Sequence, residues 1–375
     1  MSRYKIAFLH LDEIHHINHF ISVAIELSKE HDVEILTFPG KHDYLLSTLK
    51  NLNGKAVKVE QLPTMGFRAL TDRLKGRELP RKGFWLKKNK NYILDTFDAV
   101  VFTDYFHHEL FKSRKDAKKP KFLKFAHGAP GRSYSFRKDQ ADFDFQLLYS
   151  DFQFQELKKR GLLGEHPVVV GYPKVDSIVK TKISFFKNDN PVVVYNPHFS
   201  QPLSSWHYWG QEILNFFLEN KDFNLIFAPH INLFKHKGGL KPDLIDQKFY
   251  KPENIYIDLG SEKSVNMTYV NAADIYLGDV SSQVYEFIIK PRPCVFLNPT
   301  AADYKESIEF RFWKCGKVVS DLSNLSDALN KSQKDFNEFK TIQQKITDEN
   351  FYTEENTTAS ERAALAIVEY LDNSL

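Results

Sequence analysis

Short apolar runs alternate with amphipathic segments from the start of the chain. Residues 4–9 and 32–38 are apolar and rich in β-favouring side chains, and residues 19–29 between them have apolar positions at helical spacing. A strand, a helix and a strand with short joins favour a parallel pair with a right-handed crossover. Further strands of the same sheet are predicted at residues 99–103, 121–126, 144–148 and 167–170, with a helix over 151–160.

A second series of the same kind follows the largely polar residues 181–190. Strands are predicted at residues 191–195, 223–228, 255–258, 275–277, 294–297 and 317–320, and helices at, for example, 209–219 and 360–375. The pattern predicts an α/β fold of the GT-B type, with two doubly wound Rossmann-like domains facing a cleft and a C-terminal crossover helix. The expected domains are residues 1–178 and 185–355, with residues 356–375 packing back on the first domain.

Composition narrows the class of protein. A length of 375 residues suits two domains, and 42% hydrophobic residues can fill two cores. The net charge of +3 gives no argument for nucleic acid. The two cysteines fit a reducing compartment, the N-terminus lacks signal-peptide features, and no run approaches the 18 apolar residues of a membrane span. We therefore expect a cytoplasmic protein.

Two serines follow a predicted strand in the second half of the chain. The strand ends at Gly278-Asp279, and we expect Ser281 and Ser282 in the first turn of the next helix. Free N–H groups and the helix dipole attract anions there, so the serines could bind a pyrophosphate while Glu286 takes ribose hydroxyls. An ordinary helix N-cap is the alternative.

His127 and Gly128 directly follow the strand predicted at 121–126. A histidine at a strand end can take a proton from an attacking hydroxyl at neutral pH, and a glycine beside it lets a ligand approach the backbone. The alternative is a loop histidine that only forms hydrogen bonds.

Pro229-His230 ends the second strand of the C-terminal half, and its imidazole N–H could bind a donor phosphate. Tyr195 and His198 surround the end of the first strand and are a weaker signal for a phosphate or nucleoside loop; an ordinary turn is the favoured alternative.

The first strand-to-helix loop and the domain junction also carry candidate residues. Gly171 and Lys174 lie at the junction, where the lysine could reach a phosphate. We expect the loop after the first strand to bind the acceptor. Its polar residues are Asp12, Glu13, His15, His16 and His19. Zinc on His15 and His19 with Asp12 lacks a clear further ligand, so no metal is expected.

Residues 67–92 interleave basic and aromatic side chains. Such a surface can bind anionic lipid head groups, with Phe84 and Trp85 as apolar anchors, which would place the protein peripherally on the inner face of the cell membrane. A solvated loop with packed aromatics is the alternative. No nucleic-acid-binding motif accompanies the stretch.

Taken together, the ordered motifs resemble the CDP-glycerol glycerophosphotransferase family, which includes teichoic-acid primases and polymerases. The motifs are HG at 127, GYPKVD at 171, YNPH at 195, APH at 228 and DVSSQVYEF at 279, and the resemblance spans about residues 120–300. It implies a GT-B-like fold, a cytidine diphosphate donor and transfer without metal or cofactor. It also implies that His127 is the base and that His230, Ser281 and Ser282 hold the donor phosphates.

The resemblance completes the predicted site. The catalytic residues are His127 and His230. The donor-binding residues are Gly171, Lys174, Tyr195, His198, Pro229, Asp279, Ser281, Ser282 and Glu286. The acceptor-binding residues, in the N-terminal domain, are Asp12, Glu13, His15, His16 and Gly128.

Departures from the family pattern leave the donor open. Ala228 stands where the family usually has lysine, Lys174 where it has arginine, and Val280 where it has tyrosine. CDP-glycerol, CDP-ribitol, another CDP-alcohol and a nucleotide sugar all fit. The predicted function is transfer of a glycerol-phosphate-like or sugar unit from a cytidine nucleotide to a glycan or lipid-linked acceptor in surface-glycan synthesis. The alternatives are a GT-B glycosyltransferase using a UDP-, GDP- or CMP-sugar, and a non-catalytic nucleotide-binding protein on the same fold.

Overall fold

The computed structural model describes residues 3–77, 79–115, 119–128, 130, 135–178, 183–234 and 240–375. These residues divide into two compact units. Unit 1 holds the described residues up to Pro130, those between 135 and 178, and the C-terminal segment Glu349–Leu375. Unit 2 holds the described residues from 183 to Asp348.

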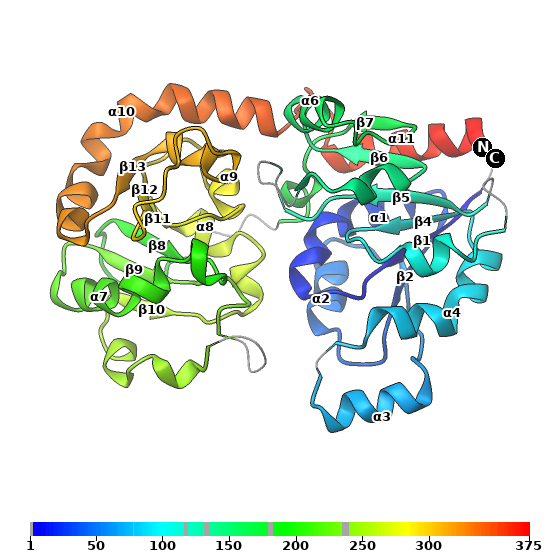
Figure 1. The fold of residues 1–375 in the computed structure, drawn as a ribbon, viewed down its shortest axis with the longest axis horizontal. Helices are drawn as coiled ribbons and strands as arrows, with labels where there is room; N and C mark the ends of the chain where they lie inside the picture. The colour runs from blue at the N-terminus through cyan, green and yellow to red at the C-terminus, as the bar shows by residue number, and fades with distance from the viewer. Residues whose placement is uncertain are drawn as a thin grey trace. The chain divides into compact units, whose positions relative to one another are not determined.

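Unit 1 is built on a sheet of seven parallel strands in the order β3-β2-β1-β4-β5-β6-β7 (Figure 1). The central strands are buried along almost their whole length, as expected for a parallel sheet covered on both faces. The strands are β1 Lys5–Leu9, β2 Asp32–Thr37, β3 Lys58–Gln61, β4 Ala99–Phe102, β5 Lys121–Phe125, β6 Phe145–Leu148 and β7 Pro167–Val169.

Unit 2 has six parallel strands in the order β10-β9-β8-β11-β12-β13. This is the doubly wound Rossmann order, in which the chain returns after β10 to the other side of β8 and then continues in the opposite direction across the sheet. The strands are β8 Val192–Asn196, β9 Asn224–Phe227, β10 Ile255–Ile257, β11 Ile275–Gly278, β12 Cys294–Leu297 and β13 Lys317–Val319. The predicted fold class, two doubly wound Rossmann-like domains, is confirmed.

Helices connect the strands in both units. The α-helices are α1 Ile21–Leu27, α2 Asp43–Asn51, α3 Gly66–Leu74, α4 Lys82–Thr96, α5 His108–Phe111, α6 Asp151–Lys159, α7 Trp206–Glu219, α8 Thr268–Ala272, α9 Gln283–Ile288, α10 Leu325–Asn350 and α11 Ala359–Ser374. The 3-10 helices are η1 Ile14–His19, η3 Lys138–Asp142, η4 Pro173–Val175, η5 Gln201–Leu203, η6 Pro242–Leu244, η7 Gln247–Tyr250, η8 Glu262–Ser264, η9 Ile308–Cys315 and η10 Leu322–Asn324.

Each sheet packs against helices that bury large apolar side chains. In unit 1, Trp85, Leu86 and Ile93 of α4 join the core on β1, β4 and β5. In unit 2, α7 and the first turns of α10 cover one face of the sheet. Burial of this apolar surface supplies the main driving force for folding of each unit.

The C-terminal helix α11 packs on α1 in unit 1. Its N-cap, Thr358, forms a reciprocal capping box with Glu361. Asp176 accepts hydrogen bonds from both the N–H and the hydroxyl of Ser360, at 2.8 and 2.7 Å. This contact fixes the start of α11, and the Ser360 hydroxyl also forms a hydrogen bond of 2.8 Å with the hydroxyl of Ser22 on α1.

Three local differences separate the structure from the sequence-based expectations. The helix expected over residues 19–29 is divided into η1 and the shorter α1. Residues 67–92 are not a loop but contain α3 and most of α4. The edge strand β3 and the long helix α10 had no counterpart in the prediction.

Candidate active site

The strand order locates the ligand-binding edge of each sheet. In doubly wound folds, ligands bind beyond the carboxyl ends of the strands where the strand order reverses. That point lies between β1 and β4 in unit 1 and between β8 and β11 in unit 2. Most of the candidate residues named from the sequence follow these strands or their neighbours β5 and β9.

In unit 1, Thr103 orients two histidines at this edge. Nδ1 of His127 lies 3.0 Å from the carbonyl oxygen of Thr103, and Nδ1 of His16 lies 3.0 Å from the Thr103 hydroxyl. A carbonyl oxygen can only accept, so His127 carries its hydrogen on Nδ1 and the lone pair of the neutral ring is on Nε2. The two rings lie close together, with centroids 4.1 Å apart. Nε2 of His127 is therefore the atom that can take a proton.

The surroundings keep both imidazoles neutral. Burial, and then the charge of Lys124, lower the pKa of His127 below its ordinary value of 6.5. Burial and the neighbouring His127 lower the pKa of His16 much further. Lys124 is itself buried, and burial lowers the pKa of its ammonium to about 7. A histidine whose pKa is lowered in this way is in the basic form at neutral pH.

Lys82 lies between two carboxylates beside the histidines. Its Nζ pairs with Asp12 and lies 3.1 Å from Oδ2 of Asp104. Burial raises the pKa of Asp12 to about 6 although Lys82 opposes the rise. Oδ2 of Asp12 is buried and has no hydrogen-bond partner among the described residues. Lys124, Thr103 and Asp104 were not named as site residues from the sequence, and Lys82 was assigned only to the basic stretch 67–92. Thr103 ends a predicted strand and Asp104 follows it, which was the available signal.

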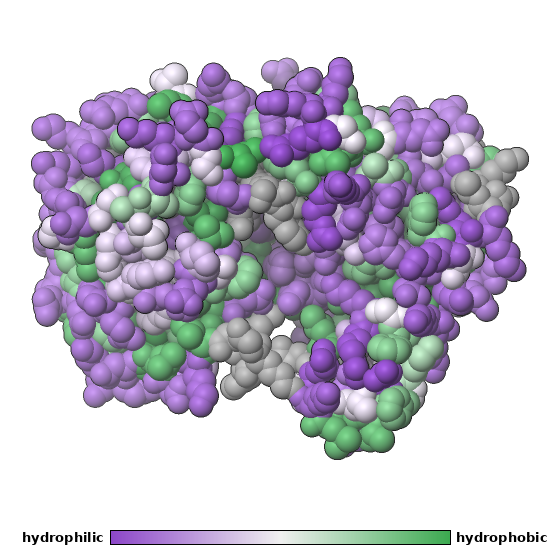
Figure 2. Space-filling model, viewed as in Figure 1, coloured by the Kyte–Doolittle hydropathy of each residue, from purple (hydrophilic) through white to green (hydrophobic). Residues whose placement is uncertain are grey.

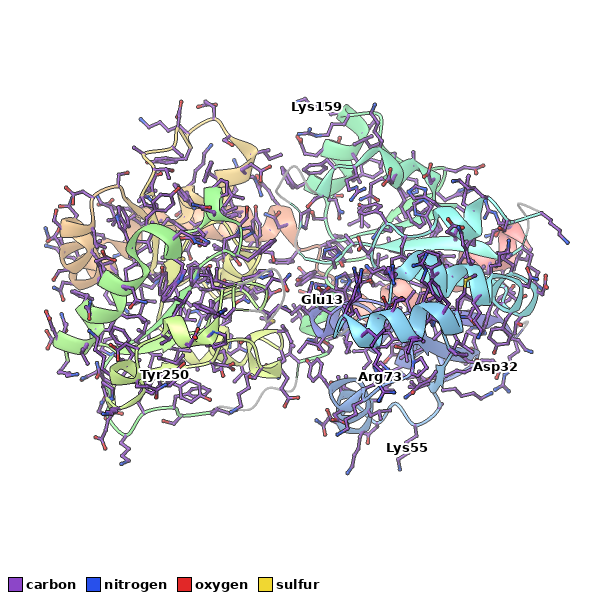
Figure 3. The ribbon with its side chains drawn as sticks, turned by 60° about the horizontal axis from the view of Figure 1, so that its bottom comes forward. Glu13, Asp32, Lys55, Arg73, Lys159 and Tyr250 are labelled. Carbon is purple, nitrogen blue, oxygen red and sulfur yellow. The ribbon has the colours of Figure 1, made fainter. Side chains whose placement is uncertain are left out.

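The remaining predicted acceptor residues lie in the same loop region. Glu13 is at the N-cap of η1 and is partly exposed (Figure 3), and the rings of His15 and His16 are 4.4 Å apart. The N–H of Gly128 donates to Nε2 of His19 at 3.2 Å, so η1 also holds the backbone after His127. The structure thus brings the predicted acceptor-binding residues and His127 together.

In unit 2, Asp279 ties the end of β11 to the loop after β8. Its Oδ2 accepts from the backbone N–H groups of His198 and Ser205, at 2.9 and 2.8 Å. The side chain is buried, and burial raises its pKa to about 7. Oδ1 has no hydrogen-bond partner among the described residues. Asp279 therefore holds the shape of the predicted donor loop.

Two histidines of unit 2 have the opposite tautomer from His127. Nδ1 of His198 accepts from the N–H of Ser200 at 3.0 Å, and Nδ1 of His230 accepts from the N–H of Asn232 at 3.1 Å. A neutral ring that accepts through Nδ1 carries its hydrogen on Nε2. The ring centroids are 5.8 Å apart. Both side chains can therefore donate to an anion from neighbouring strand ends.

The serine motif differs in one respect from the prediction. Helix α9 begins at Gln283, with Ser282 at its N-cap, so the two serines precede the first turn that was expected to carry them. Gly278, the last residue of β11, packs closely against β8, since a Cβ there would be 2.9 Å from the carbonyl oxygen of Asn196. The hydroxyl of Ser281 accepts from the N–H of Gln283 at 3.2 Å, and Glu286 is buried within α9.

The other predicted donor residues have identifiable structural contacts. Tyr195 shares a hydrogen bond of 2.8 Å with the hydroxyl of Ser205, and Pro229 is buried after β9. Lys174 is buried on η4 in unit 1. Gly171 has φ +96°, and a Cβ there would be 2.5 Å from the carbonyl oxygen of Tyr352, so close packing alone explains this glycine. Roles of Gly171 and Lys174 in donor binding stay predictions.

Solved structures share this architecture. An S. aureus MnaA–UDP structure superposes with a TM-score of 0.67 at 14% identity, covering 98% of this chain and 97% of that one. The wall teichoic acid polymerase TagF with CDPG gives 0.63 at 13% identity, covering 100% and 90%. The Neisseria meningitidis UDP-GlcNAc 2-epimerase bound to UDP-GlcNAc gives 0.58 at 13% identity, covering 99% and 100%. These likenesses show the fold, and the predicted GT-B class is confirmed.

The fold and the family comparison define a transferase of the GT-B class. The profile of the CDP-glycerol:poly(glycerophosphate) glycerophosphotransferase family matches residues 100–369. The chain belongs to this family, as the motif resemblance predicted. A search of curated proteins found no match to the sequence.

Proposed function

We propose that this protein transfers a polyol-phosphate unit, glycerol phosphate or a close analogue, from a cytidine diphosphate donor to a hydroxyl of a surface glycan or its lipid-linked precursor. The acceptor oxygen attacks the phosphorus that bears the polyol, and a new P–O bond forms. The bond between the two phosphates breaks and CMP leaves. The proton of the acceptor hydroxyl passes to the base, which accounts for all the atoms of the reaction. Family membership supports this reaction class.

The observation that carries the proposal is that the histidines of the two units have opposite tautomers. The Thr103 carbonyl fixes the hydrogen of His127 on Nδ1 and leaves Nε2 to take the proton of the acceptor. His198 and His230 accept through Nδ1 and present Nε2–H, which suits the diphosphate of the donor. In this proposal unit 1 contributes the base, and unit 2 contributes the hydrogen-bond donors that bind the phosphates. A phosphoryl transfer requires both.

Charge development on the leaving group gives the unit 2 histidines a role in rate as well as in binding. Negative charge grows on the CMP phosphate as the bond between the phosphates breaks. Preorganised N–H donors stabilise such charge without reorganisation at the moment of reaction. Asp279 accepts hydrogen bonds from the backbone N–H groups of His198 and Ser205 and so holds the loop that carries His198. The N–H group of the His198 ring is therefore in position before the nucleotide binds.

Ligand-dependent thermal stability tests the donor assignment. CMP, CDP-glycerol and CDP-ribitol should each raise the melting temperature. At a ligand concentration one hundred times Kd, the free energy of unfolding should increase by about 2.7 kcal/mol. His230→Gln and the double change Ser281→Ala/Ser282→Ala should weaken this shift, whereas the exposed Ser323→Ala should not. Equal shifts in wild type and both site variants would remove these residues from the donor site. A larger shift with UDP- or GDP-sugars would favour the glycosyltransferase alternative.

Turnover of CDP-glycerol with an isolated acceptor tests the base. His127→Ala should lower kcat by about 10²–10⁴-fold with donor affinity nearly kept, which is the usual contribution of a general base. His166→Ala, a change of an exposed histidine elsewhere in unit 1, is the matched control. Near-normal kcat in His127→Ala at pH 7 would assign the proton to another group.

Some of the residues that the sequence predicted to contact the membrane are buried or paired in the structure. Trp85 is fully buried and donates to the carbonyl of Leu62, and Lys82 is engaged by Asp12 and Asp104, so these side chains are not membrane anchors. The exposed apolar side chains are on α3. Phe67, Leu70 and Leu74 are 69%, 57% and 78% exposed, and their spacing places them on one helix face. Figure 2 shows this apolar patch on the surface of α3.

We propose that α3 lies on an anionic membrane surface that holds a lipid-linked acceptor. Arg68, Arg73 and Lys75 flank the apolar face, as in interfacial amphipathic helices. Described residues contain no helix long and apolar enough to cross a bilayer.

Co-sedimentation with vesicles tests the contact. Wild type should bind anionic vesicles and release them as salt rises, because each basic side chain contributes about 1 kcal/mol near such a surface. The triple change Phe67→Ser, Leu70→Ser and Leu74→Ser should abolish binding. Leu365→Ser, a change of a 60% exposed leucine on α11, should keep it. Wild type that stays in the supernatant with anionic vesicles at low salt would favour a soluble glycan acceptor.

A further inference from the structure

Three imidazoles from two separate segments converge at the edge of the unit 1 sheet. His15 and His16 lie in η1, and His127 follows β5. One ring nitrogen of each lies within 4.8 Å of those of the other two. Zn²⁺ held by nitrogen ligands at about 2.0–2.1 Å places neighbouring ligand atoms about 3.4 Å apart. Modest ring rotations would therefore bring the three nitrogens onto one ion.

The backbone and hydroxyl of Thr103 support two of these rings as they would in a metal site. Metal-binding histidines usually donate their outer N–H to a carbonyl, a carboxylate or water, which fixes the tautomer and the ring orientation. His127 donates from Nδ1 to the Thr103 carbonyl, and the Thr103 hydroxyl can accept from Nδ1 of His16. In both rings Nε2 is then the nitrogen that could bind a metal ion.

Oxygen ligands and charge balance are also present. Asp12 and Glu13 each place a carboxylate oxygen within 4.8 Å of a ring nitrogen of His16. Asp12 is buried, and its Oδ2 has no hydrogen-bond partner within the described part of the chain. The ammonium group of Lys82 is shared between Asp12 and Asp104, so its charge is already offset. Burial lowers the pKa of the Lys124 ammonium, which also acts on His127, to about 7.

We propose that His15, His16 and His127, with a carboxylate of Asp12 or Glu13, bind one divalent transition-metal ion of the Zn²⁺ class. Three imidazoles and a carboxylate are ligands that such ions prefer over Mg²⁺ or Ca²⁺. The ion would take the Nε2 lone pair of His127. Metal binding and deprotonation of the acceptor therefore exclude one another, and the ion acts as a reversible inhibitor. This consequence rests on the proposed function, whereas the site itself does not.

No metal was expected from the sequence, because His15, His19 and Asp12 lacked a clear further ligand. The structure replaces His19 with His16 and adds His127 from a strand more than a hundred residues away in the chain. A second cluster, His107, His108 and Asp142, also has metal-ligand spacing, but the side chain of His108 is half exposed, and the further carboxylate of Asp139 lies 3.9 Å from its Nε2. That cluster provides the matched control.

Titration of the chelator-stripped protein with Co²⁺ and Zn²⁺ tests the site without any substrate. Wild type should bind one equivalent of Co²⁺ with visible bands typical of nitrogen and oxygen ligation, and Zn²⁺ should displace it. His16→Ala and His127→Ala should each weaken binding at least tenfold, while His107→Ala/His108→Ala should leave it unchanged. Circular dichroism melts would verify that each variant is folded. Absence of binding, or loss only in the His107/His108 variant, overturns the proposal.

Activity measurements then test the inhibitory consequence. Zn²⁺ should inhibit transfer from CDP-glycerol at concentrations matching its measured Kd, and a chelator should restore the rate. Zn²⁺ that binds this site and leaves the rate unchanged, or raises it, would overturn the inhibitory role. If no donor is turned over at all, the proposed function fails, while the metal titration still decides whether the site exists.

Discussion

Replacing Asp279 with asparagine should change how the stability of unit 2 depends on pH. The carboxyl group is buried, and burial raises its pKa from 3.8 to about 7. Its Oδ2 accepts two backbone N–H groups, from His198 and Ser205. An asparagine amide oxygen can accept the same two hydrogen bonds, so the variant should keep the loop while losing the titration.

The sign of the effect follows from where the proton is held. Between pH 4 and pH 7 the folded protein keeps the proton on Asp279, whereas the unfolded chain has released it. The unfolded state binds fewer protons in this range, so the free energy of unfolding falls as pH rises. The free energy of unfolding falls by about 1.36 kcal/mol for each pH unit, and by about 4 kcal/mol across the whole range between the two pKa values. Asparagine does not titrate, so wild type should lose this stability relative to the variant.

Urea unfolding followed by tryptophan fluorescence measures the difference. Trp206, Trp209 and Trp313 are in unit 2, and only Trp85 is in unit 1, so the signal reports mainly on unit 2. Trp313 also donates its indole N–H to the carbonyl of Asp279. Unfolding free energies of wild type and Asp279→Asn would be compared at half-unit steps from pH 4.5 to pH 8.

The expected result is a difference, wild type minus variant, that becomes less favourable as pH rises to about 7 and is level above it. Asp222→Asn removes one exposed carboxylate from the same unit and controls for net charge. A difference that is flat across the range, or that grows with pH, would refute the assignment of a raised pKa to Asp279.

Three further predictions concern unit 1. Because burial and a nearby ammonium lower the pKa of His127, kcat/KM should stay level as pH falls to 6.5 and decline only below it; an inflection above pH 7 would contradict this. Lys82→Met should raise the pKa of Asp12 above about 6, so urea unfolding should show a larger loss of stability at pH 8 than at pH 5, and equal losses would count against the ion pair. Gly171→Ala should cost about 1–3 kcal/mol, since φ is +96° and the new Cβ meets the Tyr352 carbonyl; an unchanged melting temperature would exclude this strain.

The strands could be predicted from the sequence because buried parallel strands are continuous apolar runs. β4, with the sequence AVVF, is buried at every residue and has no competing pattern. β3 escaped prediction because KVEQ at the sheet edge is partly exposed and three of its four residues are polar. Helix α4 was hidden for a different reason: its lysines and aromatics indicated a surface, although Leu86, Asn89 and Ile93 are buried at helical spacing.

The site shows a different limit of sequence reasoning. Polar residues directly after buried strands identified His127, His198 and His230, because the carboxyl ends of parallel strands share one edge of the sheet. All three have the same sequence context, a histidine just past a strand, yet their expected chemistry differs. The difference comes from the partner of Nδ1, which is the Thr103 carbonyl for His127 and a following N–H group for the other two.

That partner is a backbone atom in every case, and side-chain patterns do not reveal it. The contact of His127 crosses from β5 to the end of the neighbouring strand β4, so it exists only once the sheet has formed. The contacts of His198 and His230 are local turns that depend on the backbone directions after β8 and β9. In the proposed reaction, folding therefore decides whether a histidine acts as a base or as a hydrogen-bond donor to phosphate. A variant that preserves His127 but moves the Thr103 carbonyl is expected to lose catalysis, as His127→Ala is.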